Sequence, residues 1–322
     1  MSISDSPFTM RLGTRGSMLA RTQSGQVADE LMRRCPGLQI ELVIYKTSGD
    51  LFTDRPLHEA GGKGLFTKEL ELALLAGEID FAVHSFKDVP VTMPLVAQDE
   101  LLIGAVPPRQ DVRDVLVSRE GYEDLSALPI GARVGTGSLR RRCQLLAARP
   151  DLEVAPLRGN LDTRLRKCRD GEYDAVVLAM AGIVRADLYR PGEMIPLSTD
   201  VMLPAAGQGA LALQCCRDDE RVRGLLSLIH DPVTAACVRA ERAVVAGLNG
   251  DCHSPIGALA TIEGDGQITL RAAVGMPGGG LPVLTATATT PARQQRRAVE
   301  QVLIDLRRKN ADQLHACMAA AI

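Results

Sequence analysis

The chain has 322 residues, of which 46% are hydrophobic and 24% are charged, and its mean hydropathy is close to zero. This composition is typical of a folded globular protein and excludes wholesale disorder. The formal net charge of −2 gives no bulk attraction to nucleic acid, and no apolar stretch approaches the length of a membrane span. A chain of this length is expected to form two or three domains.

Arginine outnumbers lysine by thirty-one to six, which bears on the class of ligand. A guanidinium binds a carboxylate through two parallel hydrogen bonds, so an arginine-lined cleft would suit an acidic small molecule. For any single arginine, solvated surface charge remains the alternative. The eight cysteines form no CxxC pair and show no zinc-ligand spacing. The first residues do not resemble a secretory signal, so free thiols in the cytoplasm and no metal site are expected.

Strand-like and helix-like segments alternate through the first two thirds of the chain, as in parallel βαβ units of an α/β fold. The expected strands are Met10–Gly13, Leu38–Ile44, Ile79–Val83, Ala132–Gly135, Glu153–Pro156 and Tyr173–Ala179. The expected helices are about Ser17–Arg34, Leu65–Ala76, Leu139–Ala148 and Leu161–Arg169. In such sheets, ligands bind at the carboxyl ends of strands, next to helix N-termini.

The last part of the chain has a different pattern. A helix over about Val233–Ala246 is followed by three strand-like runs and an amphipathic helix from about Ala292. The three runs are Ala258–Ile262, Ile268–Val274 and Val283–Ala288. This order predicts a small α+β domain of its own.

Two glycine-containing segments near the N-terminus suggest anion binding. In Arg11–Ser17, the amides at a helix start together with Arg15 could hold an anion, although a serine such as Ser17 is usually only a helix cap. The second segment, GGKGLF around Lys63, is not a nucleotide P-loop, because Leu65 stands where a hydroxyl is required. A lid or a carboxylate-binding lysine is the better interpretation.

The segment His84–Pro90 places Lys87 and Asp88 directly after a buried strand. Consecutive side chains diverge, so the two are expected to line a loop that faces a cleft rather than to pair with each other. An aspartate there could accept hydrogen bonds from substrate N–H groups and stabilise developing positive charge. For a bare Lys-Asp pair, a surface turn is the commoner structure.

The segment VGTGSLRRR places Thr136 and Ser138 at a helix start, with Arg140 and Arg141 in the first turn. The helix dipole disfavours cations at that end, so an anionic ligand is expected to offset the cost. The same pocket would include Arg158, Arg164 and Arg185, whereas Arg142 has no clear partner in this scheme.

The segment GDCHSPIG places Cys252 on a glycine- and proline-containing loop, next to a histidine that could lower the pKa of its thiol. By itself, a lone cysteine is more often an inert structural residue. A thiol hydrolase using Cys252 and His253 is the least favoured function, because adjacent residues rarely face each other and no third orienting group is evident.

Four stretches occurring in this order resemble the hydroxymethylbilane synthase (porphobilinogen deaminase) family. They are GGKGLFTKELELALLAGEIDFAVHSFKDVP, VGTGSLRRRCQL, LRGNLDTRL and GDCHSPIGA, and the similarity extends from Arg11 to about Gly257. Gly137 replaces a serine of the family pattern, and His253 stands where other members often have glutamine. The resemblance implies a transferase of tetrapyrrole biosynthesis, which condenses four porphobilinogens stepwise into linear hydroxymethylbilane with release of ammonia.

The resemblance also implies roles for individual residues. Asp88 would be catalytic, and Cys252 would carry a dipyrromethane cofactor through a thioether bond. The residues implied to bind cofactor and substrate are Arg15, Ser17, Asp50, Lys63, Ser85, Lys87, Thr136, Ser138, Arg140, Arg141, Arg158, Arg164, Arg185 and Gln208. Porphobilinogen and the growing polypyrrole chain would be the partners of a monomer that binds neither nucleic acid nor membrane.

The fold implied by the resemblance consists of two α/β lobes similar to type-2 periplasmic binding proteins, plus a small α+β C-terminal domain. Domain 1 would comprise residues 1–107 with 207–229, domain 2 residues 108–206, and domain 3 residues 230–322. This architecture leaves one alternative of another class, a non-catalytic solute-binding or sensor protein. Release of ammonia from porphobilinogen would distinguish the two.

Overall fold

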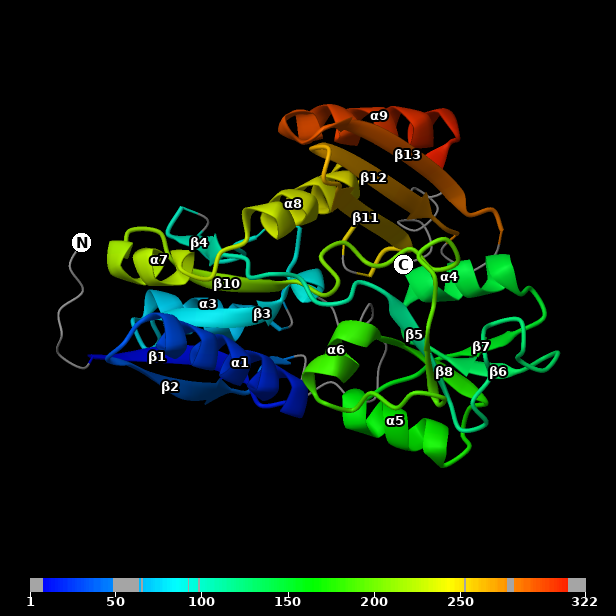
Figure 1. Cartoon of the computed structure of the whole chain (residues 1–322), viewed down its shortest axis with the longest axis horizontal. Helices are drawn as coiled ribbons and strands as arrows, with labels where there is room; N and C mark the ends of the chain where they lie inside the picture. The colour runs from blue at the N-terminus through cyan, green and yellow to red at the C-terminus, as the bar shows by residue number, and fades with distance from the viewer. Residues whose placement is uncertain are drawn as a thin grey trace. The chain divides into compact units, whose positions relative to one another are not determined.

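The computed structural model in Figure 1 describes residues 8–48, 64, 66–91, 93–97, 99–251, 253–276 and 281–311. The chain divides into two compact units. Unit 1 comprises Met1–Arg109 and Ala210–Ala235, and unit 2 comprises Gln110–Gly209 and Ala236–Ile322. The chain therefore passes between the units at Arg109–Gln110, at Gly209–Ala210 and at Ala235–Ala236. Within the described residues, no helix is both long and apolar enough to cross a membrane.

Unit 1 contains a five-stranded sheet with the order β2-β1-β3-β10-β4. Its strands are β1 (Phe8–Arg15), β2 (Leu38–Tyr45), β3 (Phe81–Ser85), β4 (Leu101–Ala105) and β10 (Leu211–Cys216). Strand β1 is parallel to β2 and β3, whereas β10 is antiparallel to both of its neighbours. The carboxyl ends of β1, β2 and β3 therefore meet at one edge of the sheet.

Helices cover both faces of this sheet. Helix α1 (Met18–Arg34) and helix α7 (Glu220–Ser227) contribute buried side chains to one core cluster, together with Phe81 and Leu213 of the sheet. Helix α3 (Lys68–Leu75) buries Leu70 and Leu74 in a second cluster. Alternation along β3 divides its residues between these two faces, which decides the side from which each functional residue at its end projects.

Unit 2 repeats this arrangement in a sheet with the order β7-β6-β8-β5-β9. Its strands are β5 (Asp114–Ser118), β6 (Arg133–Gly135), β7 (Glu153–Ala155), β8 (Ala175–Ala179) and β9 (Met194–Pro196). Strand β6 is parallel to β7 and β8, and β5 is antiparallel to β8 and β9. Helix α4 (Leu139–Ala148) packs on one face, while α5 (Leu161–Arg169) and α6 (Met180–Arg185) pack on the other.

A three-stranded antiparallel sheet, β11-β12-β13, forms the remaining part of unit 2. It is built from β11 (Ile256–Ile262), β12 (Gln267–Val274) and β13 (Leu284–Pro291), and it is preceded by α8 (Pro232–Gly247). Helix α9 (Gln295–Arg308) packs on β12 and β13 through a stripe that includes Val302 and Leu306. The expected α/β fold with a small C-terminal α+β part is thus confirmed.

The sequence-based expectations missed several elements. They omitted β4, β5, β9, β10, α6 and α7, and they named only the parallel βαβ units, whereas both larger sheets also contain antiparallel pairs. In each sheet the antiparallel strand, β10 or β5, directly follows a passage of the chain from the other unit. Strand direction after such a passage depends on long-range pairing, which a short apolar run such as LALQCC does not encode.

Gly209, at the second passage between the units, has a φ of +86°. A Cβ atom at this position would lie 2.4 Å from the carbonyl oxygen of Gln110. We expect Gly209→Ala to lower the free energy of unfolding by about 2 kcal/mol or more, because the left-handed backbone and the contact with a carbonyl oxygen both disfavour a side chain.

The matched control is Gly224→Ala in helix α7. An added Cβ meets no described atom within 4 Å there, so we expect stabilisation by roughly 0.5–1 kcal/mol. Urea-induced unfolding of both variants measures the difference. If the two substitutions change the unfolding free energy equally, the close approach at Gly209 is not what constrains that position.

Candidate functional site

In unit 1, candidate residues lie where the parallel strands end. Arg15 is the last residue of β1, and Ser85 is the last residue of β3. The two strands pair in parallel through Leu12–Phe81 and Gly13–Ala82, so their carboxyl ends lie side by side. Ser17 caps helix α1, where its Oγ accepts a hydrogen bond from the backbone N–H of Ala20. The capping role considered for Ser17 is therefore present, and its ligand role stays a prediction.

The turn that carries Lys87 and Asp88 is a short 3₁₀ helix, Phe86–Asp88. Phe86 is buried, and its backbone N–H donates to the carbonyl oxygen of Ala210 at 3.0 Å. These two contacts hold the turn against β10 and leave Lys87 and Asp88 half-buried at the strand ends. A Lys-Asp pair is more often found in a solvated surface turn. A turn that is held by these two contacts does not fit that description.

Two further side chains orient residues at this edge. The hydroxyl of Ser85 donates to Oε1 of Gln23, a buried residue of helix α1, at 3.1 Å. The guanidinium of Arg15 lies over the ring of Phe66, with 4.1 Å between its carbon and the ring centroid. A cation held over an aromatic ring keeps its charge while its orientation is restricted.

His84 belongs to a buried polar chain just before this turn. Gln214 Nε2 donates to Oε1 of Glu71 at 3.2 Å, so the amide oxygen of Gln214 faces His84 Nε2 at 3.1 Å. Because an amide oxygen only accepts, Nε2 of His84 must carry the proton. Oε2 of Glu71 accepts from the backbone N–H groups of Leu95 and Val96. This chain connects the residues after the turn to β3 and β10.

The pKa of His84 is lowered from 6.5 to about 4, mainly by burial, and the charge of Arg15 lowers it further. The unfolded chain therefore binds one more proton than the folded chain between pH 6.5 and 4. Stability due to the neutral imidazole is complete above pH 6.5 and is lost as the pH falls towards 4. We expect this one group to remove about 3 kcal/mol from the unfolding free energy across that window.

The measurement is unfolding free energy against pH for the unsubstituted chain and for His84→Gln. We expect the unfolding free energy of the unsubstituted chain to fall more steeply between pH 6.5 and 4. The difference in slope should correspond to the uptake of about one additional proton on unfolding. Parallel curves over that window would show that the imidazole is not held neutral in the folded state.

In unit 2, candidate residues again follow the carboxyl ends of the parallel strands. Thr136 and Ser138 come after β6, Arg158 comes after β7, and Arg185 ends the helix that follows β8. Ser138 caps α4, and its backbone N–H donates to Oγ1 of Thr136 at 3.2 Å. The first sheet thus has a counterpart that carries hydroxyls and guanidiniums at the equivalent edge.

Asp114, which begins β5, is the partner of both arginines at the start of α4. Its Oδ2 accepts from Nη1 of Arg140 at 2.8 Å, and its Oδ1 accepts from Nε and Nη2 of Arg141 at 3.0 and 2.8 Å. Burial alone would raise the pKa of Asp114, but the charges of the two arginines outweigh it and hold this pKa well below its usual range. Burial lowers the pKa of Arg140.

The pairing with Asp114 changes the charge balance at the start of α4 from the one expected from the sequence. The sequence predicted that an external anion offsets the two cations at the start of α4. The structure provides an internal anion, Asp114, which contributes one negative charge against two positive charges. The internal carboxylate offsets part of the cost, and the two arginines share this one carboxylate among the ion pairs of the described residues.

The other candidates of unit 2 hold backbone groups. Arg164 Nε donates to the carbonyl oxygen of Gly159 at 2.7 Å, close to Arg158 in the chain. Arg185 Nη2 donates to the carbonyl oxygen of Gly209 at 2.8 Å, and burial lowers its pKa to about 10. Gln208 is fully buried, and its Nε2 donates to the carbonyl oxygen of Val112 and to Oδ1 of Asp114.

Gly137 lies in the turn after β6, where a side chain has little room. A Cβ atom at this position would lie 2.8 Å from the carbonyl oxygen of Leu157. The turn after β6 therefore packs closer to the segment after β7 than a serine would allow.

The loop around residue 252 is held by Asp251. Its Oδ1 accepts hydrogen bonds from the backbone N–H groups of His253 and Ser254, at 2.9 and 3.0 Å, and from the hydroxyl of Ser254. The carbonyl oxygen of Pro255 accepts from the N–H of Gly275 at the end of β12. Cys252 itself, like Asp50 and Lys63, lies outside the described residues.

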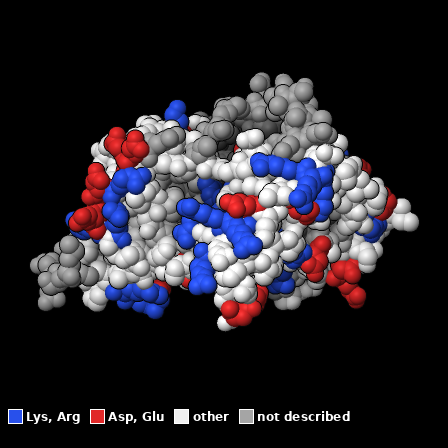
Figure 2. Space-filling model, turned by 90° about the horizontal axis from the view of Figure 1, so that it is seen from above, with Lys and Arg blue, Asp and Glu red and all other residues white. Residues whose placement is uncertain are grey.

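Several other arginines lie at the surface beside acidic side chains. Arg33 and Arg34 pair with Glu30, and Arg113 pairs with Asp111. Figure 2 shows the same mixture on one face, where groups of Lys and Arg alternate with Asp and Glu. These arginines fit the description of solvated surface charge, in contrast to the buried Arg140 and Arg141.

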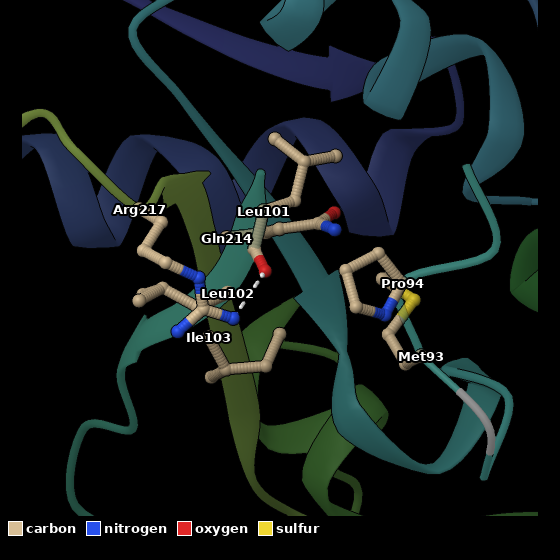
Figure 3. A pocket seen from close by; sticks show the side chains of 7 residues that line it. All are labelled: Met93, Pro94, Leu101, Leu102, Ile103, Gln214 and Arg217. Atoms are coloured by element: carbon tan, nitrogen blue, oxygen red, sulfur yellow. Dashed lines mark hydrogen bonds between the residues drawn. The ribbon is translucent and has the colours of Figure 1, made fainter. Parts of the chain in front are cut away.

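One pocket of roughly 220 Å³ lies in unit 1, between β4, β10 and the segment around Pro94 (Figure 3). None of the sequence-predicted site residues lines it. Its one charged side chain, Arg217, donates to the carbonyl oxygens of Asp99 and Leu101, as Figure 3 shows for Leu101. A site for several carboxylates needs more cations than this single arginine, so the pocket does not match one.

Comparison with known proteins decides the family. The sequence profile described as porphobilinogen deaminase, dipyromethane cofactor binding domain, matches residues 10–224, and the profile of the C-terminal domain matches residues 235–304. The porphobilinogen deaminase of Syntrophobacter fumaroxidans is 46% identical over 298 residues, covering 92% of this chain and 94% of the relative. The chain belongs to the porphobilinogen deaminase family.

A second relative by sequence and one solved structure were also found. The porphobilinogen deaminase of Xanthomonas oryzae pv. oryzae is 51% identical over 260 residues, 80% of this chain and 83% of the relative. A nutrient binding protein from Burkholderia cenocepacia bound to methionine is 15% identical, with a TM-score of 0.42, and covers 69% of this chain and 92% of that chain.

As a porphobilinogen deaminase, the chain is a transferase of tetrapyrrole biosynthesis, a hydroxymethylbilane synthase that acts on porphobilinogen. The matching profile also identifies its cofactor as dipyrromethane. The alternative of a non-catalytic binding or sensor protein is not favoured, because the relatives are named as the enzyme.

The residues of unit 2 fit an anionic cofactor. Dipyrromethane carries several carboxylates, and the Arg140–Arg141 pair has only one carboxylate partner among its ion pairs in the described chain. Arg140 Nε is buried and has no hydrogen-bond partner among the described residues. A buried donor without a partner is costly unless a ligand satisfies it.

Sequence reasoning missed Asp114, Gln23, Glu71 and Gln214. Asp114 is the last residue of the arginine-containing segment PPRQDVRD and could have been noticed as an acid at the start of a buried strand. The other three carry no local signal, since each lies far in the chain from its partner at the end of β3 or in the segment after it.

Proposed function

We propose that Asp88 is the catalytic carboxylate of this deaminase. The anchored turn Phe86–Asp88, beside the end of β1, supports this assignment. The carboxylate of Asp88 accepts a hydrogen bond from the pyrrole N–H of porphobilinogen and stabilises the positive charge that develops as ammonia leaves. Lys87 and Arg15 are cations near the same edge, where they attract the acidic substrate.

The remaining candidate residues bind the cofactor, the substrate and the growing chain, and the cations and hydroxyls among them bind the carboxylates. These residues are Ser17, Asp50, Lys63, Ser85, Thr136, Ser138, Arg140, Arg141, Arg158, Arg164, Arg185 and Gln208, together with Arg15 and Lys87. The observation that carries this proposal is the position of the described members, which follow the carboxyl ends of parallel strands or lie in the helices and segments next to them. That edge is where ligands bind in open α/β sheets.

Cys252 is proposed as the attachment point of the dipyrromethane through a thioether bond. When bound, the cofactor supplies the terminal pyrrole to which the first porphobilinogen is joined. The other described cysteines support this choice, because burial raises the pKa of Cys168 to about 11 and that of Cys215 to about 12. Thiols held protonated are poor nucleophiles.

Three further proposals concern the domain bounds, the cellular compartment and the oligomeric state. The domains are residues 1–107 with 207–229, residues 108–206, and residues 230–322. The six described cysteines are free thiols, which suits a reducing cytoplasm. The protein is proposed to act there as a monomer, and gel filtration with light scattering tests the monomer.

The test of the proposed site is an intact mass under denaturing conditions, with peptide mapping around Cys252. The expected result is an excess equal to two linked porphobilinogen-derived units on the peptide that contains Cys252. If the mass is unmodified, porphobilinogen is added and covalent loading is followed. An excess on another cysteine, or no loading at all, would contradict the proposed attachment.

A further inference from the structure

Four side chains in unit 2 form a single buried cluster around one carboxylate. We call it the Asp114 node, and it consists of Asp114, Arg140, Arg141 and Gln208. Asp114 is completely buried and accepts four hydrogen bonds from the other three residues, at distances of 2.8 to 3.0 Å. Removing the carboxylate would therefore release three residues at once.

The donors of the two arginines are used differently. Arg141 donates from all three nitrogens, to Asp114 and to the carbonyl oxygen of Val177. Arg140 uses Nη1 for Asp114 and for the carbonyl oxygen of Leu203, whereas its Nε has no partner among the described residues. Each nitrogen of Arg141 thus makes one hydrogen bond, with a second N–H on each Nη, and Nε of Arg140 keeps its donor for another acceptor.

The node also connects the arginines to both segments at which the chain enters and leaves this sheet. Asp114 lies four residues after the first passage, and Gln208 lies just before the second. The two segments bond each other, because the N–H of Gln110 donates to the carbonyl oxygen of Gly209 at 3.1 Å. The position of the arginine pair is therefore tied to the two segments through Asp114.

We propose that Asp114 is a positioning residue for this deaminase, which holds the Arg140–Arg141 pair in the orientation that binds cofactor carboxylates. Its negative charge fixes both guanidiniums while leaving one positive charge of the pair for the ligand. This inference rests on the proposed role of Arg140 and Arg141 in carboxylate binding. Asp114 itself does not touch the ligand.

The test compares Asp114→Asn with Asp114→Glu, because the two variants separate charge from shape. Asparagine keeps the size of the side chain and removes its charge, whereas glutamate keeps the charge in a longer side chain. The readout is the fraction of purified protein that carries the cofactor, measured by intact mass. We expect Asp114→Asn to carry at least about tenfold less cofactor than the unsubstituted enzyme, and Asp114→Glu to carry more than Asp114→Asn.

A merely structural role predicts the reverse order, since a longer side chain disturbs a packed interior more than an amide of the same size. If Asp114→Asn loads normally, or loads better than Asp114→Glu, the proposal is wrong. Glu71→Gln is the matched control, because Glu71 is a fully buried carboxylate that accepts hydrogen bonds from two backbone N–H groups and an amide, none of them an arginine. It should lose thermal stability and keep its cofactor.

Failure of the underlying proposal has a different signature. The fraction of protein that carries the cofactor is measured by intact mass for Arg140→Gln and Arg141→Gln as well. Normal loading in both would show that the pair does not bind the cofactor, whatever Asp114 does. Poor loading in both, combined with normal loading of Asp114→Asn, would contradict only the positioning role.

Discussion

Replacing Asp88 by asparagine is expected to lower the rate of hydroxymethylbilane formation by roughly 10²–10⁴-fold. The amide keeps the size of the side chain, but it has no charge to stabilise the cation that forms when ammonia leaves. The turn itself is held by Phe86 and its bond to Ala210, so the fold should remain. Release of ammonia from porphobilinogen, at saturating substrate, is the measurement.

The control for this substitution is Asp80→Asn at the opposite end of β3. Asp80 accepts hydrogen bonds from the backbone N–H and the guanidinium of Arg11, so its loss should cost about 1 kcal/mol of stability. Its turnover should be close to normal, because it lies at the amino end of the strand. Near-normal turnover in Asp88→Asn would contradict the catalytic role of Asp88. Intact mass of the same variant checks that the cofactor is still attached.

Replacing Cys252 by serine is expected to abolish covalent attachment of the cofactor and with it turnover. A serine hydroxyl is far less nucleophilic than a thiolate at neutral pH, so no thioether analogue should form. The purified variant should have the mass of the bare chain, before and after porphobilinogen is added. Ser254 and the backbone N–H of His253 still bond to Asp251, so the loop should keep its conformation.

The control for this prediction is Cys216→Ser. Cys216 is the one half-buried thiol among the six described free cysteines, and burial raises its pKa. This variant should carry the cofactor as the unsubstituted chain does. A covalent adduct that persists in Cys252→Ser and disappears in Cys216→Ser would move the attachment point to strand β10.

Much of the local structure follows from the sequence. The short apolar run before His84 and the glycine turn after Gly135 predicted that Asp88 and Thr136 follow strand ends, and the structure has β3 and β6 there. Local periodicity and turn residues act over a few positions, so they can be interpreted without the fold. The motif order likewise indicated the family that the comparisons confirm.

What the tertiary structure alone decided is how these segments are held. Strand β10 is antiparallel within the first sheet, Gln214 reaches both Glu71 and His84, and Asp114 pairs with arginines at the start of α4. Each of these contacts joins residues far apart in the chain, and their formation depends on the register of strands rather than on local pattern. The sequence by itself therefore determined which residues lie at the strand ends, whereas long-range packing decided which buried partners orient them and what charge remains for the ligand.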